Sequence, residues 1–260
     1  MTQLLNYKIT TPEIEKHAVP ILLMHGLFGD MNNLGMIARG LEEYTTIQID
    51  ARNHGDSFHS DIMNYEAMAQ DIQNLLAHLE IEKVILIGHS MGGKAVMTVT
   101  KLIPDKIDKL IIIDVAPVAY EERRHDEILA ALKAVDASNI TNRREAAELM
   151  REYITEGDFV IQFLLKSFRD GKFRFNIPVL DTEYEAVSGW EKVPAWPGKI
   201  LFIIGGDSPY VQRAYQTEVQ AQFPNASAVV IAGAGHWVHA QKTDLVLKAI
   251  HNFLDKNPSE

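Results

Sequence analysis

Short apolar runs rich in β-branched residues recur along the chain, over residues 19–24, 45–50, 83–88, 109–115, 199–204 and 226–232. Between several of them the apolar residues return every three or four positions, as over 65–79 and 243–255, which is the spacing of one helix face. Strands that alternate with helices are typical of parallel βαβ units. We therefore predict an α/β protein with a mostly parallel sheet flanked by helices, and residues 3–9 as an additional edge strand.

The run Val84–Ile87 leads directly into a serine between two glycines, Gly88-His-Ser90-Met-Gly92, and a helical pattern follows to Leu102. Ser90 is thus expected on a tight corner, where glycine on either side lets strand and helix pass close to it. The N-terminus of the following helix offers free N–H groups to a developing oxyanion. We predict that Ser90 is a nucleophile, as in the α/β-hydrolase fold; the alternative is an ordinary strand-to-helix turn.

A serine hydroxyl needs a histidine base, and the chain has ten histidines. In this fold the base follows the last core strand, which selects His236 in Gly-Ala-Gly-His-Trp. His239, three residues later, would share a helical face with it, and we expect it to pack near the site. The chain lacks HExxH and other metal-binding patterns and has no cysteine, so we expect neither a metal nor a cofactor.

The acid that orients the base has two candidates. In most chains of this fold it lies three residues past the glycine that ends the strand over 199–204, but here that position is Ser208, which carries no charge. Asp207 lies one residue earlier, and Asp114 closes the preceding strand, where some hydrolases carry their acid. We prefer Asp114 and keep Asp207 as the alternative acid. Ser208 is then a supporting hydrogen-bond partner of the acid or the base.

The buried strand over 21–24 ends in a glycine-rich turn, His25-Gly-Leu-Phe-Gly. In this position an HG loop supplies one N–H to the oxyanion, and the residue after the nucleophile supplies the other. We assign these donors to the main chain of Leu27 and Met91, and we expect His25 to order the loop. The segment 50–57 reads as a structural turn, with Asp50 and Arg52 as an expected pair.

Several motifs together resemble one bacterial group, namely HGLFGD, DxRNHGDS, GHSMGGK, IIIDVAPV, GGDSPY and GAGHWVH. They are similar to the YbfF-type esterases of the α/β-hydrolase superfamily, along nearly the whole chain. The resemblance implies a serine nucleophile at Ser90, a base at His236, an acid at Asp114 and a supporting serine at Ser208. It also implies action on short-chain esters, with acyl-CoA thioesters as a further substrate class.

The alternation of strands and helices breaks between Asp114 and Lys199. We predict an α/β-hydrolase core over 1–116 and 199–260 and a helical cap or lid over 117–198 that roofs the serine. Candidate substrate-binding residues are Phe28, Phe163, Phe168, Trp190 and Trp237, although apolar positions at helical spacing often serve only lid packing. The cationic stretch 166–174 is a candidate contact for coenzyme A phosphates, or merely a solvated face.

The composition and net charge of the chain disfavour several classes of binding partner. With 47% hydrophobic and 23% charged residues the chain has an ordinary globular composition, and its net charge of −10 disfavours binding to nucleic acid and to anionic membranes. The start of the sequence lacks the pattern of a signal peptide, so we expect a cytoplasmic location. The absence of cysteine excludes disulfides and thiol catalysis. The sequence does not indicate an oligomeric state.

These features predict a serine carboxylesterase or thioesterase that hydrolyses small or short-chain acyl esters through a Ser-His-Asp triad and an acyl-enzyme. Haloalkane dehalogenases and epoxide hydrolases are excluded, because they carry an aspartate where this chain has Ser90. One alternative is a carbon–carbon bond hydrolase with the same triad. Another is a non-catalytic ligand-binding protein built on the hydrolase fold.

Overall fold

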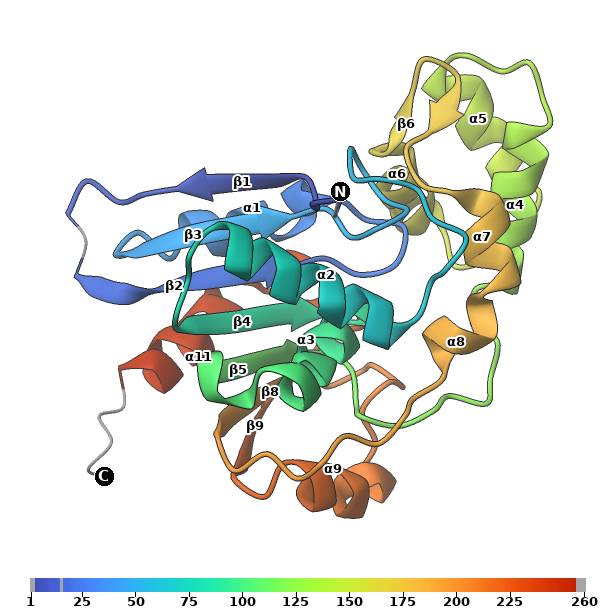
Figure 1. Cartoon of the computed structure of the whole chain (residues 1–260). Coiled ribbons are helices and arrows are strands. Elements are labelled where there is room, and N and C mark those ends of the chain that lie inside the picture. Colours follow the sequence, from blue (N-terminus) through green and yellow to red (C-terminus); the bar gives the residue numbers. More distant parts are fainter. Residues whose placement is uncertain (1–2, 15, 256–260) are drawn as a thin grey trace.

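The computed structural model describes residues 3–14 and 16–255, which form a twisted sheet with helices on both faces (Figure 1). The sheet has seven strands in the spatial order β1-β3-β2-β4-β5-β8-β9, and only β1 is antiparallel to its neighbour. The strands are β1 Tyr7–Thr10, β2 His17–Met24, β3 Tyr44–Ile49, β4 Val84–His89, β5 Ile107–Ile113, β8 Lys199–Gly205 and β9 Ala226–Ile231. The prediction of a mostly parallel α/β sheet is confirmed.

The helices of the core follow the expected connections between strands. They are α1 Gly35–Arg39, α2 Tyr65–His78, α3 Met91–Leu102, α9 Gln216–Gln222, α10 Val238–Gln241 and α11 Thr243–Leu254. Short 3₁₀ turns occur at η1 Met31–Leu34, η2 Pro104–Lys106 and η3 Arg213–Tyr215. None of the helices in the described ranges is both long and apolar enough to cross a membrane.

Alternate residues of each central strand face opposite sides of the sheet, and each side has its own buried cluster. In β4, for example, Leu86 packs into the cluster on the side of α2 and α3, whereas Ile85 and Ile87 pack into the cluster with α1 and α11. Because both faces are buried, the central strands are continuously apolar rather than alternating. This closely packed layer fixes the positions of the strand ends, where the polar residues of the candidate site lie.

Residues 114–198 leave the sheet between β5 and β8, and their helices gather beyond one end of the strands (Figure 1). The elements are α4 Asp126–Asp136, α5 Arg143–Met150, α6 Asp158–Leu165, β6 Phe168–Arg169, β7 Lys172–Phe173, α7 Ile177–Thr182 and α8 Tyr184–Ser188. The hairpin β6–β7 was not predicted, although Asp170-Gly171 is a typical hairpin turn and both residues have positive φ, 51° and 77°. Apolar side chains of these helices join the core cluster beneath α2 and α3.

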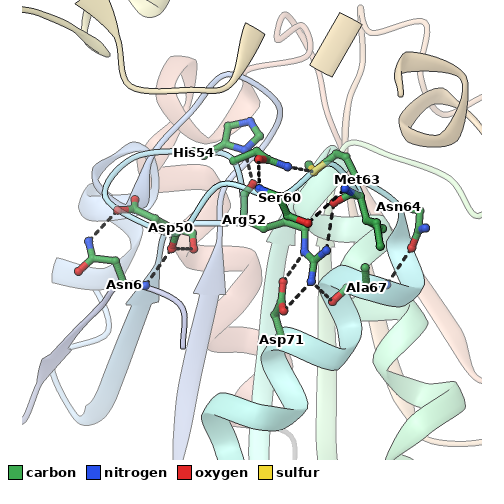
Figure 2. A network of polar contacts seen from close by, with 12 residues as sticks. Asn6, Asp50, Arg52, His54, Ser60, Met63, Asn64, Ala67 and Asp71 are labelled. Atoms are coloured by element: carbon green, nitrogen blue, oxygen red, sulfur yellow. Dashed lines mark hydrogen bonds and ion pairs between the residues drawn. The ribbon is translucent and has the colours of Figure 1, made fainter. Parts of the chain in front are cut away.

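The turn after β3 is held by two separate carboxylates (Figure 2). Asp50 accepts hydrogen bonds from the Asn6 side chain at 2.8 Å and from the Met31 backbone N–H at 2.7 Å. Arg52 donates to Asp71 of α2, with its Nε 2.6 Å from Oδ2 and its Nη2 2.8 Å from Oδ1. The expected pair of Asp50 with Arg52 is therefore wrong, because the guanidinium reaches the helix that packs beside the turn.

We expect the ion pair of Arg52 and Asp71 to stabilise the folded protein. The Asp71 side chain is 5% exposed, so replacing it by alanine leaves a buried guanidinium without its counter-charge. We expect Asp71→Ala to lower the free energy of unfolding by about 3–5 kcal/mol, measured by urea denaturation.

A matched control is Asp181→Ala, which removes the partly exposed partner of the exposed Lys133 and should cost less than about 1 kcal/mol. Equal losses in the two variants would show that the buried pair contributes no more than a surface pair.

Candidate active site

Ser90 occupies the corner between β4 and α3, with φ 53° and ψ −119°. A Cβ built on Gly88 would lie 2.3 Å from the Gly92 carbonyl oxygen, and one on Gly92 would lie 2.3 Å from the Met24 carbonyl oxygen. Only glycine at both positions lets α3 approach β4 and the end of β2 this closely. The backbone N–H of Ser90 donates to the Ile113 carbonyl at 3.0 Å, which fixes the strained corner to β5.

A chain of hydrogen bonds joins Ser90, His236 and Asp114, which are far apart in the sequence. The Ser90 Oγ lies 2.9 Å from His236 Nε2, and His236 Nδ1 lies 2.7 Å from Asp114 Oδ2. Because a carboxylate only accepts, Nδ1 carries the proton and Nε2 is free to accept from the serine hydroxyl. The structure thus brings together the three side chains that the sequence singled out.

Asp114 follows β5 with φ 53°, and its side chain is fully buried. Its Oδ1 accepts from the backbone N–H of Gly205 at 2.9 Å, and its Oδ2 accepts from the Ser208 hydroxyl at 2.5 Å as well as from His236. Ser208 therefore supports the carboxylate rather than the imidazole. Asp207 is exposed, and no hydrogen bond of the described residues joins its carboxylate to His236.

The imidazole of His236 is also held by an aromatic ring. Tyr210 stacks on it with a centroid distance of 3.9 Å and an interplanar angle of 22°. Tyr120 in turn donates its hydroxyl to the Tyr210 carbonyl at 2.8 Å and accepts from the Ala116 N–H at 2.9 Å. Tyr210 thus holds the His236 ring in one orientation, which favours a constant distance to Ser90.

The glycine-rich loop after β2 lies against the serine, since a Cβ built on Gly26 would be 3.3 Å from the Ser90 Cβ. His25 Nε2 accepts from the Ala51 N–H at 3.0 Å, so its Nδ1–H donates to the Gly26 carbonyl at 2.7 Å. As expected, His25 orders this loop. Burial lowers the pKa of His25, and the imidazole stays neutral in this role.

A second neutral histidine supports the same loop. His54 Nε2 accepts from the Phe28 N–H at 3.1 Å, and burial lowers the pKa of His54 to about 3. Within the described residues, no hydrogen bond occupies the backbone N–H of Leu27 or of Met91. Both residues line a cavity together with Ser90, which leaves these two donors available to a ligand oxygen.

That cavity has a volume of about 40 Å³ and is walled mainly by tyrosines and aliphatic side chains. Besides Ser90, its lining residues are Leu27, Tyr65, Met91, Lys94, Val115, Tyr120, Glu122, Arg124, His125, Tyr184, Val187, Ser188 and Tyr210. The sequence analysis did not identify the tyrosines or Lys94. The tyrosines come from α2, α8 and two loops, and only folding brings them to the serine.

Lys94 is an unusual member of this wall because its side chain is almost fully buried in α3. Its Nζ donates to the carbonyls of Ser188 at 2.9 Å and Gly189 at 2.8 Å and lies 4.4 Å from the centre of the Tyr120 ring. Burial lowers the pKa of Lys94 to about 7. A lysine inside the apolar helix that follows Gly92 was the signal that could have revealed it.

Of the predicted substrate-binding residues, Phe28, Phe163 and Trp237 line a second, smaller cavity at Ser90. Phe168 and Trp190 do not line either cavity at the serine, so their expected placement is wrong. Phe168 packs on Phe173 in the core with a centroid distance of 5.0 Å, because the unpredicted hairpin turns it inward. The Trp190 indole N–H donates to the Gln222 side chain at 2.8 Å.

The cationic stretch 166–174 does not line these cavities, although Lys166 lies near enough to His239 to help lower its pKa. Lys166, Arg169, Lys172 and Arg174 are exposed, and none of them lines a cavity at Ser90. Arg174 forms an ion pair with Asp56. Among the residues that the structure describes, no group of three or more potential ligands is arranged to hold a metal ion.

Comparison with known proteins agrees with this architecture. The family model of the α/β-hydrolase fold matches residues 19–243. Esterase YbfF of Escherichia coli is 54% identical over 96% of this chain and 99% of that protein. A protein of Xenopus laevis named "sn-1-specific diacylglycerol lipase ABHD11" is 38% identical over 91% of this chain and 80% of its own length.

A solved structure described as a marine microorganism esterase superposes with a TM-score of 0.90, at 33% identity over 97% of this chain and all of the other. The relatives and the solved structure share a fold and are named as ester hydrolases, which makes this protein an enzyme of that class. The chain belongs to the α/β-hydrolase family, and within it to the esterases of the YbfF type.

Proposed function

We propose that the protein is a serine carboxylesterase that hydrolyses esters of small or short-chain acids through an acyl-enzyme on Ser90. The observation that carries the proposal is the unbroken hydrogen-bond chain from the Ser90 hydroxyl through His236 to Asp114, with distances of 2.9 and 2.7 Å. A serine activated in this way, beside a cavity and two free N–H donors, is suited to attack on an ester carbonyl.

In the acylation step, Ser90 Oγ attacks the carbonyl carbon while His236 Nε2 takes the hydroxyl proton. The oxyanion of the tetrahedral intermediate accepts hydrogen bonds from the backbone N–H groups of Leu27 and Met91. Asp114 stabilises the imidazolium through its bond to Nδ1. The carbon–oxygen bond of the ester then breaks, and His236 returns the proton to the leaving alcohol.

In the deacylation step, His236 takes a proton from a water molecule whose oxygen attacks the acyl carbonyl. The bond between that carbon and Ser90 Oγ breaks, the proton returns to the serine, and the carboxylic acid leaves. Because Asp114 is fully buried and bonded to Ser208 and Gly205, its position is the same in both steps.

The walls around the serine favour small acyl groups. The cavity of about 40 Å³ is bounded by Tyr65, whose hydroxyl donates to the Val187 carbonyl at 2.5 Å, and by the buried Lys94. These bonds tie α2, α3 and the end of α8 together, so the cavity has little freedom to lengthen. We therefore propose that residues 117–198 act as a lid whose contacts with α2 and α3 limit chain length.

An acyl-CoA is the less favoured substrate. The cationic stretch is not in the cavity walls. Of the two arginines near the site, Arg123 lines the groove past Tyr210, and Arg124 lines both this groove and the cavity at Ser90. Each arginine already has an acidic partner, although the buried Nε of Arg124 lacks a hydrogen bond among the described residues. Arg123 forms ion pairs with Asp126 and Glu185, and Arg124 forms one with Glu122. A neutral alcohol is thus the leaving group that this groove accommodates best.

The nucleophile is tested by Ser90→Ala. Removing the hydroxyl should lower kcat for p-nitrophenyl butyrate by a factor on the order of 10⁶, because no other group can form the acyl-enzyme. A fluorophosphonate should label the wild-type protein at this residue alone, as read by peptide mass spectrometry. Labelling that persists in the variant would refute the assignment.

The acid is tested by comparing Asp114→Asn with Asp207→Asn. The first change should lower kcat by a factor on the order of 10⁴, since an amide holds the imidazole in the wrong tautomer. The exposed Asp207 should tolerate the change within about twofold, in the scatter typical of surface substitutions. A larger loss in Asp207→Asn than in Asp114→Asn would reverse the roles.

Acyl-chain selectivity is tested with p-nitrophenyl esters of two to twelve carbons. We expect kcat/KM to be highest at two to four carbons and to fall with each longer chain, because the tyrosine walls close the cavity. Val187→Ala should shift the optimum toward longer acids by removing part of one wall. A wild-type optimum at eight carbons or more would contradict the proposed limit.

A further inference from the structure

The second cavity at Ser90 has a volume of about 20 Å³. A site needs roughly 10–15 Å³ to hold one water molecule, so this cavity has room for one and little more. Its walls include both Ser90 and His236 and the loop at Gly26, so it opens on the reacting atoms. Phe163 and Leu164 of α6 close it with apolar surface.

His239 also lines this cavity, and it has no role in the two steps proposed above. The residue is 4% exposed, and its Nδ1 is one of three buried side-chain nitrogen or oxygen atoms in the described chain that lack a hydrogen-bond partner. Its ring lies against His89, with a centroid distance of 4.2 Å, but the Nε2 of His89 donates to the His236 carbonyl instead. A buried polar atom left without a partner costs about 1–3 kcal/mol, which favours a bound ligand there.

The electrostatics of His239 suit a hydrogen bond to a neutral molecule. Burial, together with the nearby His236 and Lys166, lowers the pKa of His239 to about 3, so the ring is neutral wherever the enzyme works. A neutral ring offers one donor and one acceptor nitrogen. The neutral ring does not take up a proton itself, but it can orient the molecule from which His236 takes one.

We propose that this cavity holds the water molecule that hydrolyses the acyl-enzyme, and that His239 is a positioning residue that orients this water toward His236. Ser90, His236 and His239 give the water three polar neighbours, within the two to four that buried waters usually have. The inference rests on the proposed acyl-enzyme and adds where the water that attacks it is bound.

The small volume of the cavity limits which molecule can attack the acyl-enzyme from it. Water fits the cavity, whereas methanol carries an extra methyl group and must approach from the wider groove beside Tyr210 and Trp237. His239 then speeds the attack of water without helping an alcohol. The residue therefore favours hydrolysis over transfer of the acyl group.

The experiment measures how the acyl group of p-nitrophenyl acetate divides between water and added methanol, as the ratio of methyl acetate to acetate. His239→Phe keeps the ring and removes both nitrogens, and we expect it to raise this ratio about tenfold, the effect of losing one neutral hydrogen bond. His239→Asn places an amide near the Nδ1 position and should keep the ratio within about twofold of wild type. The rate of release of p-nitrophenol in the first turnover should not change in either variant.

A second variant tests the cavity without altering the histidine. Phe163 is only partly buried, and Phe163→Ala should enlarge the site enough to admit methanol and so raise the same ratio. Phe163→Ala therefore tests the water site even if His239→Phe fails to fold. A ratio unchanged in both His239→Phe and Phe163→Ala would overturn the water site.

Failure of the acyl-enzyme itself is distinguishable. If phenyl acetate and p-nitrophenyl acetate give the wild-type enzyme different product ratios, they do not share an acyl-enzyme, and the proposed function falls. If the two ratios agree and the variants leave them unchanged, the acyl-enzyme stands and only the role of His239 is refuted.

Discussion

The arrangement of the site depends on the hydrogen bonds to one fully buried carboxylate, that of Asp114. It receives hydrogen bonds from a backbone N–H at the end of β8, from a serine in the following turn and from the imidazole after β9. Burying a carboxylate costs free energy unless its oxygens accept hydrogen bonds. Moving any of these donors away from Asp114 would therefore destabilise the folded protein. Three strand ends are thereby locked in register around a single side chain.

Ser90 depends on the same end of the sheet in a different way. Its strained backbone is held by the close approach of α3 to β4 and β2, which requires glycine at Gly88 and Gly92. The serine is bonded through its N–H to Ile113, the residue before Asp114. Ser90 and Asp114 are therefore positioned by neighbouring backbone segments, and His236 bridges them at 2.9 and 2.7 Å.

The surroundings of the site are rich in neutral histidine. Burial lowers the pKa of His25, His54 and His239, so each can accept and donate hydrogen bonds without bringing a charge near His236. His25 and His54 hold the loop that carries the free N–H of Leu27. These neutral rings therefore add no charge beside the hydrogen bond between His236 and Asp114.

The sequence by itself determined the strands of the large sheet, the corner at Ser90 and the turn that carries His236, because these follow from local periodicity and from glycine spacing. Tertiary structure decided which carboxylate bonds to His236, since Asp114 and Asp207 both lie at strand ends and only burial separates them. It also decided that Arg52 pairs with Asp71 and that tyrosines from distant segments wall the cavity. Such contacts join residues far apart in the chain, and their spacing leaves no periodic trace in the sequence.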